Sequence, residues 1–556
     1  MPLPYLTKIV SLCAVMCFIV GCDTTTVNFK ATPAITVNPN SAVPLAAIVS
    51  ATTSKPTVLL IQVSDGSQDW TIPISSALAT SHSLPILGFK PDRRHVVEVT
   101  ARDEAGNLSA TIPLEFITAA LPDDFPKLTV SVSKPEKMEP GITLFALMRW
   151  PDGADANEEF GLAIAVNEQG EVVWYRRQDP MFEHIHRMAN GNLFSMVGHN
   201  RLEEIDMLGN TVTRWHASKH PNPKAVALVS KGSIPVAVET FHHDIQQLPS
   251  GNLLVLSTEL RRIEEYPTVV DDENAAKEPA NVVGDVVVEF ARDGSIVNEW
   301  KLMDLLDVRR LGHESLGPIW GLWAYTEVEG GTKDWSHANS ISYVPETDSI
   351  LVSVRHQEAV ISFSRKSGEL NWILGTHEGW GERWGRYLLE PRGEFEWQFH
   401  QHAARMTARG SLLLFDNGNF RSLPPKPRST VEESYSRAVE YMIDTESKTV
   451  RQIWSYGGAK DELFYSPFIS EVDQLPHTGN LLITDGGRIR DGMGRQSERI
   501  VGDHHWARIM EVMYSDHPEK VFEITIDSQE YDKLTGWAIY RSDRLPSLYS
   551  GRSHTR

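Results

Sequence analysis

The sequence predicts an all-β protein, in which a six-bladed β-propeller follows a small immunoglobulin-like β-sandwich. Three observations carry this prediction. The 556 residues include 32 Pro, 38 Gly and 15 Trp, which favours many turns and few long helices. Short apolar runs alternate with turn signals from Ser41 to about Thr118. From about residue 128 to 545, one pattern recurs along the chain.

The first β region is predicted at residues 41–120. Val58–Val63, His95–Thr100 and Ile112–Phe116 are β-type runs, and Asp103–Asn107 has the composition of a turn. Six or seven strands in about 80 residues are typical of an immunoglobulin-like sandwich. Histidines and carboxylates do not cluster here, so we expect a structural or docking role.

Two elements recur between residues 128 and 545. One is an apolar strand, usually opened by Gly, and it occurs at Gly191–Ser195, Gly251–Val255, Ser349–Val352, Gly410–Leu414 and Gly479–Ile483. The other is a turn followed by a strand that ends in Trp174, Trp215, Trp300, Trp372 or Trp454. With the runs between them, each unit has about four strands, the content of one propeller blade. An initial unit near 142–177 and a final one ending at Ile524 make six.

Long insertions separate these units and predict a functional face. They fall around residues 221–240, 262–282, 303–335, 376–398 and 422–435. Insertions on one face of a ring commonly build a binding or catalytic site.

The N-terminus is typical of an exported protein. Lys8 precedes the apolar run Ile9–Val20, and Ile19-Val-Gly-Cys22 resembles a bacterial lipoprotein signal. We therefore expect a signal peptide at 1–21, lipidation of Cys22 and a tether at 22–40; a plain signal peptide or a membrane anchor is the alternative. The expected location is lipid-anchored to a bacterial membrane, facing the periplasm or the cell exterior, with inner and outer membrane left open.

Composition and motifs exclude several partners. The net charge of −20 repels phosphate backbones and no basic patch offsets it, so nucleic-acid binding is not expected. The sequence contains neither a phosphate-binding Gly-x-x-x-x-Gly-Lys-[Ser/Thr] loop nor a Gly-x-Gly-x-x-Gly turn opening a helix. No cofactor is therefore expected. The three cysteines all lie at or before Cys22, which leaves none for a disulfide or a Cys-ligated zinc in the mature chain.

Histidines gather just before the repeated strands. Aligning the units on the following Pro or Gly places His243, Asn339 and His402 at one equivalent position. The first strand of a propeller blade lines the central channel, so these side chains are expected to converge near the axis. His337 and His400 lie two residues earlier, on the same strand face. Arg355 ends a neighbouring strand within reach. His242 is the alternative to His243, and the alignment favours His243.

Three interpretations of this cluster compete. The histidines are structural in a non-catalytic surface propeller, or His243, His337 and His402 are metal ligands of a hydrolase or lyase. Alternatively, His and Asn donors with the planar fork of Arg355 hold a tetrahedral oxyanion. A permanently charged Arg and the lack of a carboxylate at the equivalent offset disfavour a metal. The anion site is preferred, with no metal.

The repeat region resembles the bacterial arylsulfotransferases that need no nucleotide sulfate donor. The resemblance covers about residues 130–545 and rests on Phe241-His-His-Asp-Ile245, His337-Ala-Asn-Ser-Ile341 with Arg355, Gln401-His-Ala403 and Phe415-Asp-Asn-Gly-Asn419. The leading domain is similar too. The family implies transfer of a sulfuryl group from an aryl sulfate donor to a phenolic acceptor, ping-pong through a sulfohistidine.

Carried over to this chain, the resemblance makes His402 the nucleophile. His337, Asn339 and Arg355 match the groups that hold the sulfuryl oxygens, and His243 matches a histidine that acts on the phenolic proton. This chain departs from members that have a disulfide, because it lacks the cysteines to form one.

Weaker signals lie nearby. Trp380 and Trp384 lie in an inserted loop and are expected to stack on the aryl substrate. The alternative is that they pack in the blade core. His242 and His400 complete the expected substrate-binding set. Asp416–Asn419 and Thr484–Gly487 are typical of Asx turns, with calcium binding as the alternative. Neither the physiological substrates nor the oligomeric state follow from the sequence.

Overall fold

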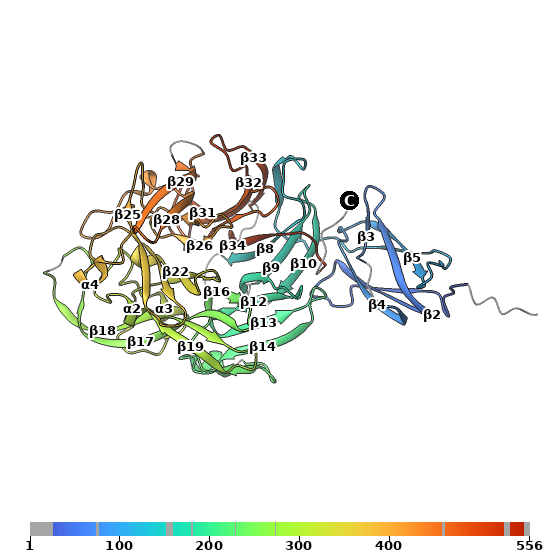
Figure 1. Ribbon diagram of the computed structural model, residues 1–556, viewed down its shortest axis with the longest axis horizontal. Helices are drawn as coiled ribbons and strands as arrows, with labels where there is room; N and C mark the ends of the chain where they lie inside the picture. Colours follow the sequence, from blue (N-terminus) through green and yellow to red (C-terminus); the bar gives the residue numbers. More distant parts are fainter. Residues whose placement is uncertain are drawn as a thin grey trace, which may run out of the picture. The chain divides into compact units, whose positions relative to one another are not determined.

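The computed structural model describes residues 26–73, 77–151, 160–178, 182–227, 229–272, 274–458, 462–527 and 534–549. The signal peptide and Cys22 lie outside these ranges. Strands dominate the described part (Figure 1), in which no helix is long and apolar enough to span a bilayer. The short helices are α1 (Pro223–Ala227), α2 (Leu302–Leu305), α3 (Ile319–Trp323) and α4 (Glu382–Gly385), with 3₁₀ turns η2 (Gly198–Asn200), η3 (Arg355–Gln357) and η4 (Val431–Glu433).

The chain divides into two compact units, and the first takes in residues up to Ile35, Val49–Leu84 and Val96–Glu115. One hydrogen-bonded sheet runs through this part of the chain in the order β1-β2-β5-β6, with β3 and β4 also paired to β2. Its strands are β1 (Ala34–Val37), β2 (Ala46–Ser64), β3 (Asp69–Thr71), β4 (Ala79–Leu87), β5 (Arg94–Arg102) and β6 (Ile112–Ile117). Val97, Val99 and Ala101 of β5 are fully buried between exposed neighbours, the period of a strand with one face in a core.

The second unit contains the repeats. Its first sheet has the order β10-β9-β8-β34-β32-β31-β30, with β33 joining β32 to β7. These strands are β7 (Leu128–Ser133), β8 (Ile142–Pro151), β9 (Gly161–Val166), β10 (Val172–Gln178), β30 (Glu471–Gln474), β31 (Leu481–Arg490), β32 (His504–Val512), β33 (Lys520–Ile526) and β34 (Leu534–Leu545).

Four further sheets each hold one repeat. The first two are β11 (Phe182–Arg187), β12 (Leu193–Val197), β13 (Arg201–Ile205), β14 (Thr211–Ala217) and β15 (Ile234–Val236), then β16 (His242–Gln247), β17 (Leu253–Pro267), β18 (Lys277–Phe290), β19 (Ile296–Lys301) and β20 (Lys333–Asp334). The other two are β21 (Ala338–Val344), β22 (Ser349–Val354), β23 (Ala359–Ser364) and β24 (Leu370–Gly375), then β25 (Glu390–Pro391), β26 (His402–Met406), β27 (Leu412–Asp416), β28 (Arg437–Asp444) and β29 (Thr449–Gly457).

The innermost strands of these sheets face one another, as expected for a propeller. Contacts run from β11 to β16, β21, β26, β30, β34 and back to β11. In Figure 1, β16, β26 and β34 lie nearer the middle of this unit than β14, β29 and β33. The all-β propeller class is confirmed. The count of six blades stays a prediction. Hydrogen bonds join the strands of the first and last repeats into one nine-stranded sheet, so the sheets do not correspond one to one with blades.

Three of the repeated tryptophans connect a sheet to the next one. Trp174 on β10 donates its indole N–H to the carbonyl of Met207, Trp215 on β14 to that of Arg292, and Trp454 on β29 to that of Ser515. Each acceptor lies in an outer turn of the following repeat. A buried indole needs a partner for its N–H, and this bond combines a large apolar contact with a fixed register between neighbours.

Two features of the fold differ from the sequence expectation. Residues 262–282, expected as an inserted loop, instead extend β17 and β18 into a long hairpin whose pairing reaches Pro267 and Lys277. The last strand, β34, lies beyond Ile524, where the sequence pattern ended the final unit. It pairs with β8 from the first repeat, almost 400 residues earlier, and joins the two ends of the propeller.

Candidate active site

Three of the predicted histidines come together with a tyrosine where the innermost strands begin. The His243 and His337 rings are 4.9 Å apart between centroids, and the Tyr540 ring lies 6.0 Å from His243 and 6.4 Å from His402. These residues come from β16, the start of β21, β26 and β34. The site is therefore built by strands from different repeats, as the repeat offset predicts.

In three repeats, a β-bulge on the innermost strand sets the direction of the side chains at the site. Register shifts occur between His242 and Ile245, between Ala338 and Ser340, and between His402 and Arg405. An extra residue at this point bends the strand and turns its side chain out of the ladder. His243 and His337 also have φ values of 58° and 47°, in the left-handed region that non-glycine residues seldom occupy. Such local strain concentrates at functional sites.

The protonation of His402 is decided by its neighbour Asn417. The Nδ2 group of Asn417 donates to the carbonyls of Ser466 and Ile469, at 2.8 and 2.9 Å. The Oδ1 atom of Asn417 must therefore be the one that faces His402, 2.7 Å from Nδ1. An amide oxygen only accepts, so Nδ1 of His402 carries the proton and Nε2 keeps a lone pair.

Burial keeps His402 neutral. The residue is buried, and desolvation together with the positive charge of Arg355 lowers the pKa of His402 well below its ordinary value. At neutral pH its Nε2 is therefore an unprotonated nitrogen, the form of imidazole that acts as a nucleophile.

The same reasoning defines the His242–His243 pair. His242 Nε2 lies 3.1 Å from the carbonyl of Ser257, so this nitrogen donates. When Nδ1 of His242 accepts, Nδ1 of His243, which lies 2.8 Å away, donates. Nε2 of His243 is left with a lone pair. Burial and the nearby His337 lower the pKa of His243 well below its ordinary value, which keeps it a neutral base.

His242 and His243 have different surroundings. His243 meets His337, whereas His242 is fully buried behind it, with its ring 4.9 Å from Trp320. His337 is fixed by Asp334, whose Oδ2 lies 2.5 Å from Nδ1. Burial and Arg355 lower the pKa of His337 to about 3. Its Nε2 remains for the site.

Asn339 is tied to its surroundings through most of its polar atoms. Its Nδ2 donates to the carbonyl of Gln401, and its own carbonyl accepts from Tyr540 and Arg541, both at 3.2 Å. Its buried Oδ1 has no protein partner. One N–H of the side-chain amide thus links β21 to Gln401, next to β26, and the expected role of Asn339 in holding the sulfuryl oxygens stays a prediction.

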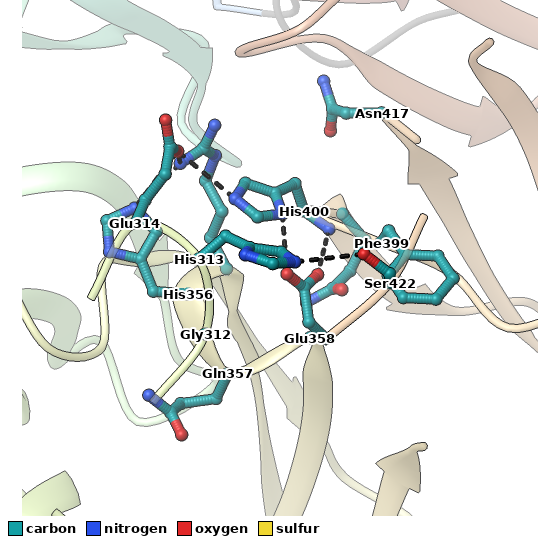
Figure 2. A network of polar contacts seen from close by, with 12 residues as sticks. Gly312, His313, Glu314, His356, Gln357, Glu358, Phe399, His400, Asn417 and Ser422 are labelled. Carbon is teal, nitrogen blue, oxygen red and sulfur yellow. Dashed lines mark hydrogen bonds and ion pairs between the residues drawn. The ribbon is translucent and has the colours of Figure 1, made fainter. Parts of the chain in front are cut away.

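Arg355 lies in a cluster of opposite and like charges. Its Nη1 is 2.5 Å from Oε2 of Glu314 and 2.8 Å from Nε2 of His356. His356 donates Nδ1–H to the carbonyl of Asp334, so its Nε2 accepts from the arginine. In Figure 2, Glu314 and Glu358 both point at His400. His400 Nδ1 is 2.7 Å from Glu358 and Nε2 is 3.2 Å from Glu314.

This cluster has the ligand types of a metal site but is filled by the arginine. Glu314, His356 and His400 offer ligand atoms within 4.8 Å of one another. The guanidinium bonds two of the three, so a cationic group already occupies the centre. In the described part of the chain, His243, His337 and His402 do not form such a group. The donor geometry thus favours an anion over a divalent cation beside Arg355.

The two loop tryptophans have structural partners. Trp380 donates to the carbonyl of Thr376 and lies under Arg310, while Trp384 donates to the carbonyl of Leu305. Both rings pack against the apolar core of the β16–β24 region. Their role in stacking on a substrate stays a prediction.

A different tryptophan, Trp323 of α3, lies at the site. Its ring stacks on His199 at 4.7 Å and is 6.2 Å from His243 and 6.1 Å from His337. Trp323 is half-buried. Trp323, Tyr540, Glu314 and the orienting role of Asn417 were not predicted from the sequence. Only Asn417 lay in a motif already singled out, where it was assigned to an Asx turn.

Comparison with known proteins identifies the family of both parts of the chain. Residues 128–541 match the family model described as Arylsulfotransferase (ASST), and residues 34–115 match the arylsulfotransferase Ig-like domain. The chain belongs to the arylsulfotransferase family. The predicted family and the immunoglobulin-like class of the leading domain are thereby confirmed.

Two relatives carry the name arylsulfate sulfotransferase AssT. The one from Escherichia coli O6:H1 is 28% identical over 373 residues, 58% of this chain and 57% of that protein. The one from Lelliottia amnigena is 24% identical over 525 residues, 79% of this chain and 82% of that protein. The match to the E. coli protein thus spans a little over half of that protein's length.

Solved structures show only distant likeness. A protein of unknown function from Bacteroides caccae is 11% identical at a TM-score of 0.30, covering 72% of this chain and 93% of that one. A Synechocystis apocarotenoid oxygenase mutant is 9% identical, also at 0.30, covering 72% and 82%. Similarity at this level indicates neither fold nor function.

Proposed function

We propose that this arylsulfotransferase moves a sulfuryl group from an aryl sulfate to a phenol, in two steps through a sulfohistidine at His402. The observation that carries the proposal is the tautomer of His402, set by Asn417, which leaves Nε2 unprotonated and the ring neutral. Family membership supports the same chemistry.

In the first step, Nε2 of His402 attacks the sulfur of the donor. The N–S bond forms as the S–O bond to the aryl group breaks, and the electron pair leaves with the aryl oxygen as a phenolate. In the second step the acceptor oxygen attacks the same sulfur, the N–S bond breaks, and the phenolic proton passes to Nε2 of His243. A neutral base in position contributes roughly 10²–10⁴-fold to such a step.

Arg355 and His337 are proposed to hold the sulfuryl oxygens. Arg355 supplies a permanent charge with planar N–H groups. The bound anion favours protonation of His337, whose Nε2–H then donates while Asp334 keeps Nδ1 in place. Donors held in advance around developing charge are the largest source of rate enhancement in many transfers.

The test uses purified protein treated with EDTA, 4-nitrophenyl sulfate as donor, and phenol as acceptor. We expect phenol-dependent release of nitrophenolate, lowered by about 10³-fold or more in His402→Ala because the nucleophile is gone. His216→Gln, a half-exposed histidine of β14, is the matched control and should keep full activity. A radiolabelled sulfuryl group should stay on the wild-type protein until phenol is added.

Other outcomes favour the alternatives. Release that EDTA abolishes and a divalent metal restores would make the histidines metal ligands. A well-folded protein without release on this donor would leave a non-catalytic propeller.

We also propose an exported, lipid-anchored location, supported by Ile19-Val-Gly-Cys22. Metabolic labelling with a fatty acid, lost in Cys22→Ser, tests it.

A further inference from the structure

The charged groups behind the sulfuryl site are arranged in a row of alternating sign. Glu358, His400, Glu314 and Arg355 follow one another, and each is ion-paired to the next. His400 and Glu358 are fully buried, while the Glu314 side chain is 36% exposed. Each ring nitrogen of His400 therefore has a carboxylate within ion-pair distance, Glu358 at Nδ1 and Glu314 at Nε2.

The row fits a doubly protonated His400. A carboxylate lies within ion-pair distance of each ring nitrogen, and two negative charges at 2.7 and 3.2 Å favour the doubly protonated, positively charged ring. Burial alone would lower the pKa of His400, but Glu358 and Glu314 outweigh it, and the net pKa is raised. Burial would raise the pKa of Glu314, but Arg355 and the two histidines outweigh it, and that pKa lies well below its usual range.

The backbone holds both inner members of the row in unusual conformations. Glu358 and His400 have φ values of 49° and 53°. The backbone N–H of His400 donates to Oε2 of Glu358, which keeps the two residues in contact. Two adjoining left-handed residues cost free energy that the surrounding contacts must offset, and their presence beside the site indicates a functional constraint.

Glu314 is held from the opposite side. Its loop is pinned by His313, whose Nε2 is 3.0 Å from Oγ of Ser422 and whose carbonyl accepts from Arg428. Figure 2 shows His313 and Ser422 next to His400. The loop thus presents the Glu314 carboxylate between His400 and the guanidinium of Arg355.

We propose that Glu358, His400 and Glu314 form a positioning relay, in which the His400 imidazolium holds the Glu314 carboxylate so that Glu314 aims Arg355 at the sulfuryl group. The inference rests on the proposed function of Arg355. None of the three residues touches the substrate. Loss of the proton from His400 would put two carboxylates against a neutral ring, release Glu314 and misplace Arg355.

Other ionisable groups also face His400. They are Arg355, His356, His313 and Glu498 in addition to the two carboxylate partners. The like-charged neighbours oppose the proton on His400, so its retention depends on Glu358 and Glu314 together.

The first test is Glu314→Gln, with Glu378→Gln as the matched control. Glu378 is an exposed glutamate of another inserted loop, paired with Lys426. The nitrophenolate burst, which reports the first step, is followed from pH 6 to 9.5. We expect kcat about tenfold lower in Glu314→Gln with KM changed less than twofold, because a charge-assisted contact that orients the arginine is lost.

The pH profile separates a relay from a merely structural residue. In the wild type and in Glu378→Gln, the rate should fall at alkaline pH as His400 loses its proton. In Glu314→Gln this alkaline limb should disappear, because His400 is no longer coupled to Arg355. A Glu314→Gln protein with the wild-type rate and limb would overturn the relay.

A second measurement does not need activity. With ¹⁵N-labelled histidine, the wild type should show a doubly protonated imidazole at pH 7.5 that is missing from His400→Gln/Glu358→Gln. The double variant removes both charges, so no buried carboxylate is left unpaired. If the wild type releases no nitrophenolate, the proposed function fails while the spectrum still decides the state of His400; a neutral ring there would sink the relay.

Discussion

His400 and His402 are two residues apart and both buried, yet their pKa values shift in opposite directions. Burial lowers both. The difference lies in the acceptors, because His402 faces the neutral amide oxygen of Asn417 and His400 faces two carboxylates. At equal burial, the charge of the neighbouring group therefore decides whether a histidine stays neutral and can act as a nucleophile, or carries a fixed positive charge.

This comparison divides the site into two regions. The region of His402, His243 and Asn417 has neutral rings with fixed tautomers, which suits bond making and proton transfer. The region of His400, Glu314 and Arg355 has full charges in a fixed order, which suits electrostatic orientation. Arg355 belongs to both, because its charge lowers the pKa of His402 and His337.

The largest effect is expected when His402 is given a carboxylate partner like those of His400. Asn417→Asp places a carboxylate against Nδ1 of His402 and should raise its pKa, so that more of the nucleophile is protonated at pH 7. We expect the burst rate at pH 7 to fall about 100-fold, since one pKa unit corresponds to a tenfold change in population. Activity should recover partly as pH rises.

The control for this change is Asn298→Asp, an exposed amide on the outer strand β19. It adds the same charge far from any catalytic proton and should leave the pH profile unchanged. An Asn417→Asp protein with the wild-type rate at every pH would show that the amide does not set the state of His402.

The repeated pattern made the first region predictable from the sequence. His243, Asn339 and His402 occupy one offset in successive repeats, and each repeat folds by the same local rules, so one alignment places all three. The bulges at these positions are also local features. The strand pattern also pointed to Arg355 and His337, whose roles came from the resemblance, and the structure brings both to the site.

The second region was not predictable in this way, because its partners come from outside the repeat. Glu314 lies in an inserted loop with no equivalent in other units. Tyr540 lies on β34, whose position depends on pairing with β8 at the other end of the domain. The period-two argument also did not anticipate the surroundings of His400, whose ring nitrogens lie beside the carboxylates of Glu358 and Glu314.

A smaller effect, on KM, is expected at Trp323, which lies beside the region of His243 and tests where the aryl group of the substrate binds. Its half-buried ring beside His243 and His337 offers a face for stacking an aryl group. Trp323→Ala should raise KM for 4-nitrophenyl sulfate about fivefold to tenfold, the equivalent of about 1 kcal/mol of stacking, with kcat little changed.

Trp384→Ala is the comparison variant, because Trp384 was predicted from the sequence to stack on the substrate. Its indole bonds Leu305 and packs in the core, so we expect lower stability and an unchanged KM. A larger increase in KM in Trp384→Ala than in Trp323→Ala would show that the aryl group stacks on the inserted loop and not on Trp323.

The smallest effect is on stability, and here the two histidines should act with opposite sign. The folded pKa of His400 is raised above its unfolded value of about 6.5, so its contribution is present below that pH and is lost as pH rises through the folded value. The folded pKa of His402 is depressed, so unfolding takes up a proton below pH 6.5 and stability falls with acid.

Urea unfolding of wild type and variants at pH 5, 7 and 9 measures both contributions to stability. Relative to wild type, His400→Gln/Glu358→Gln should gain stability from pH 7 to 9, and His402→Gln should gain it from pH 7 to 5. The same direction of change in both variants would mean that burial, not the choice of acceptor, governs the pair.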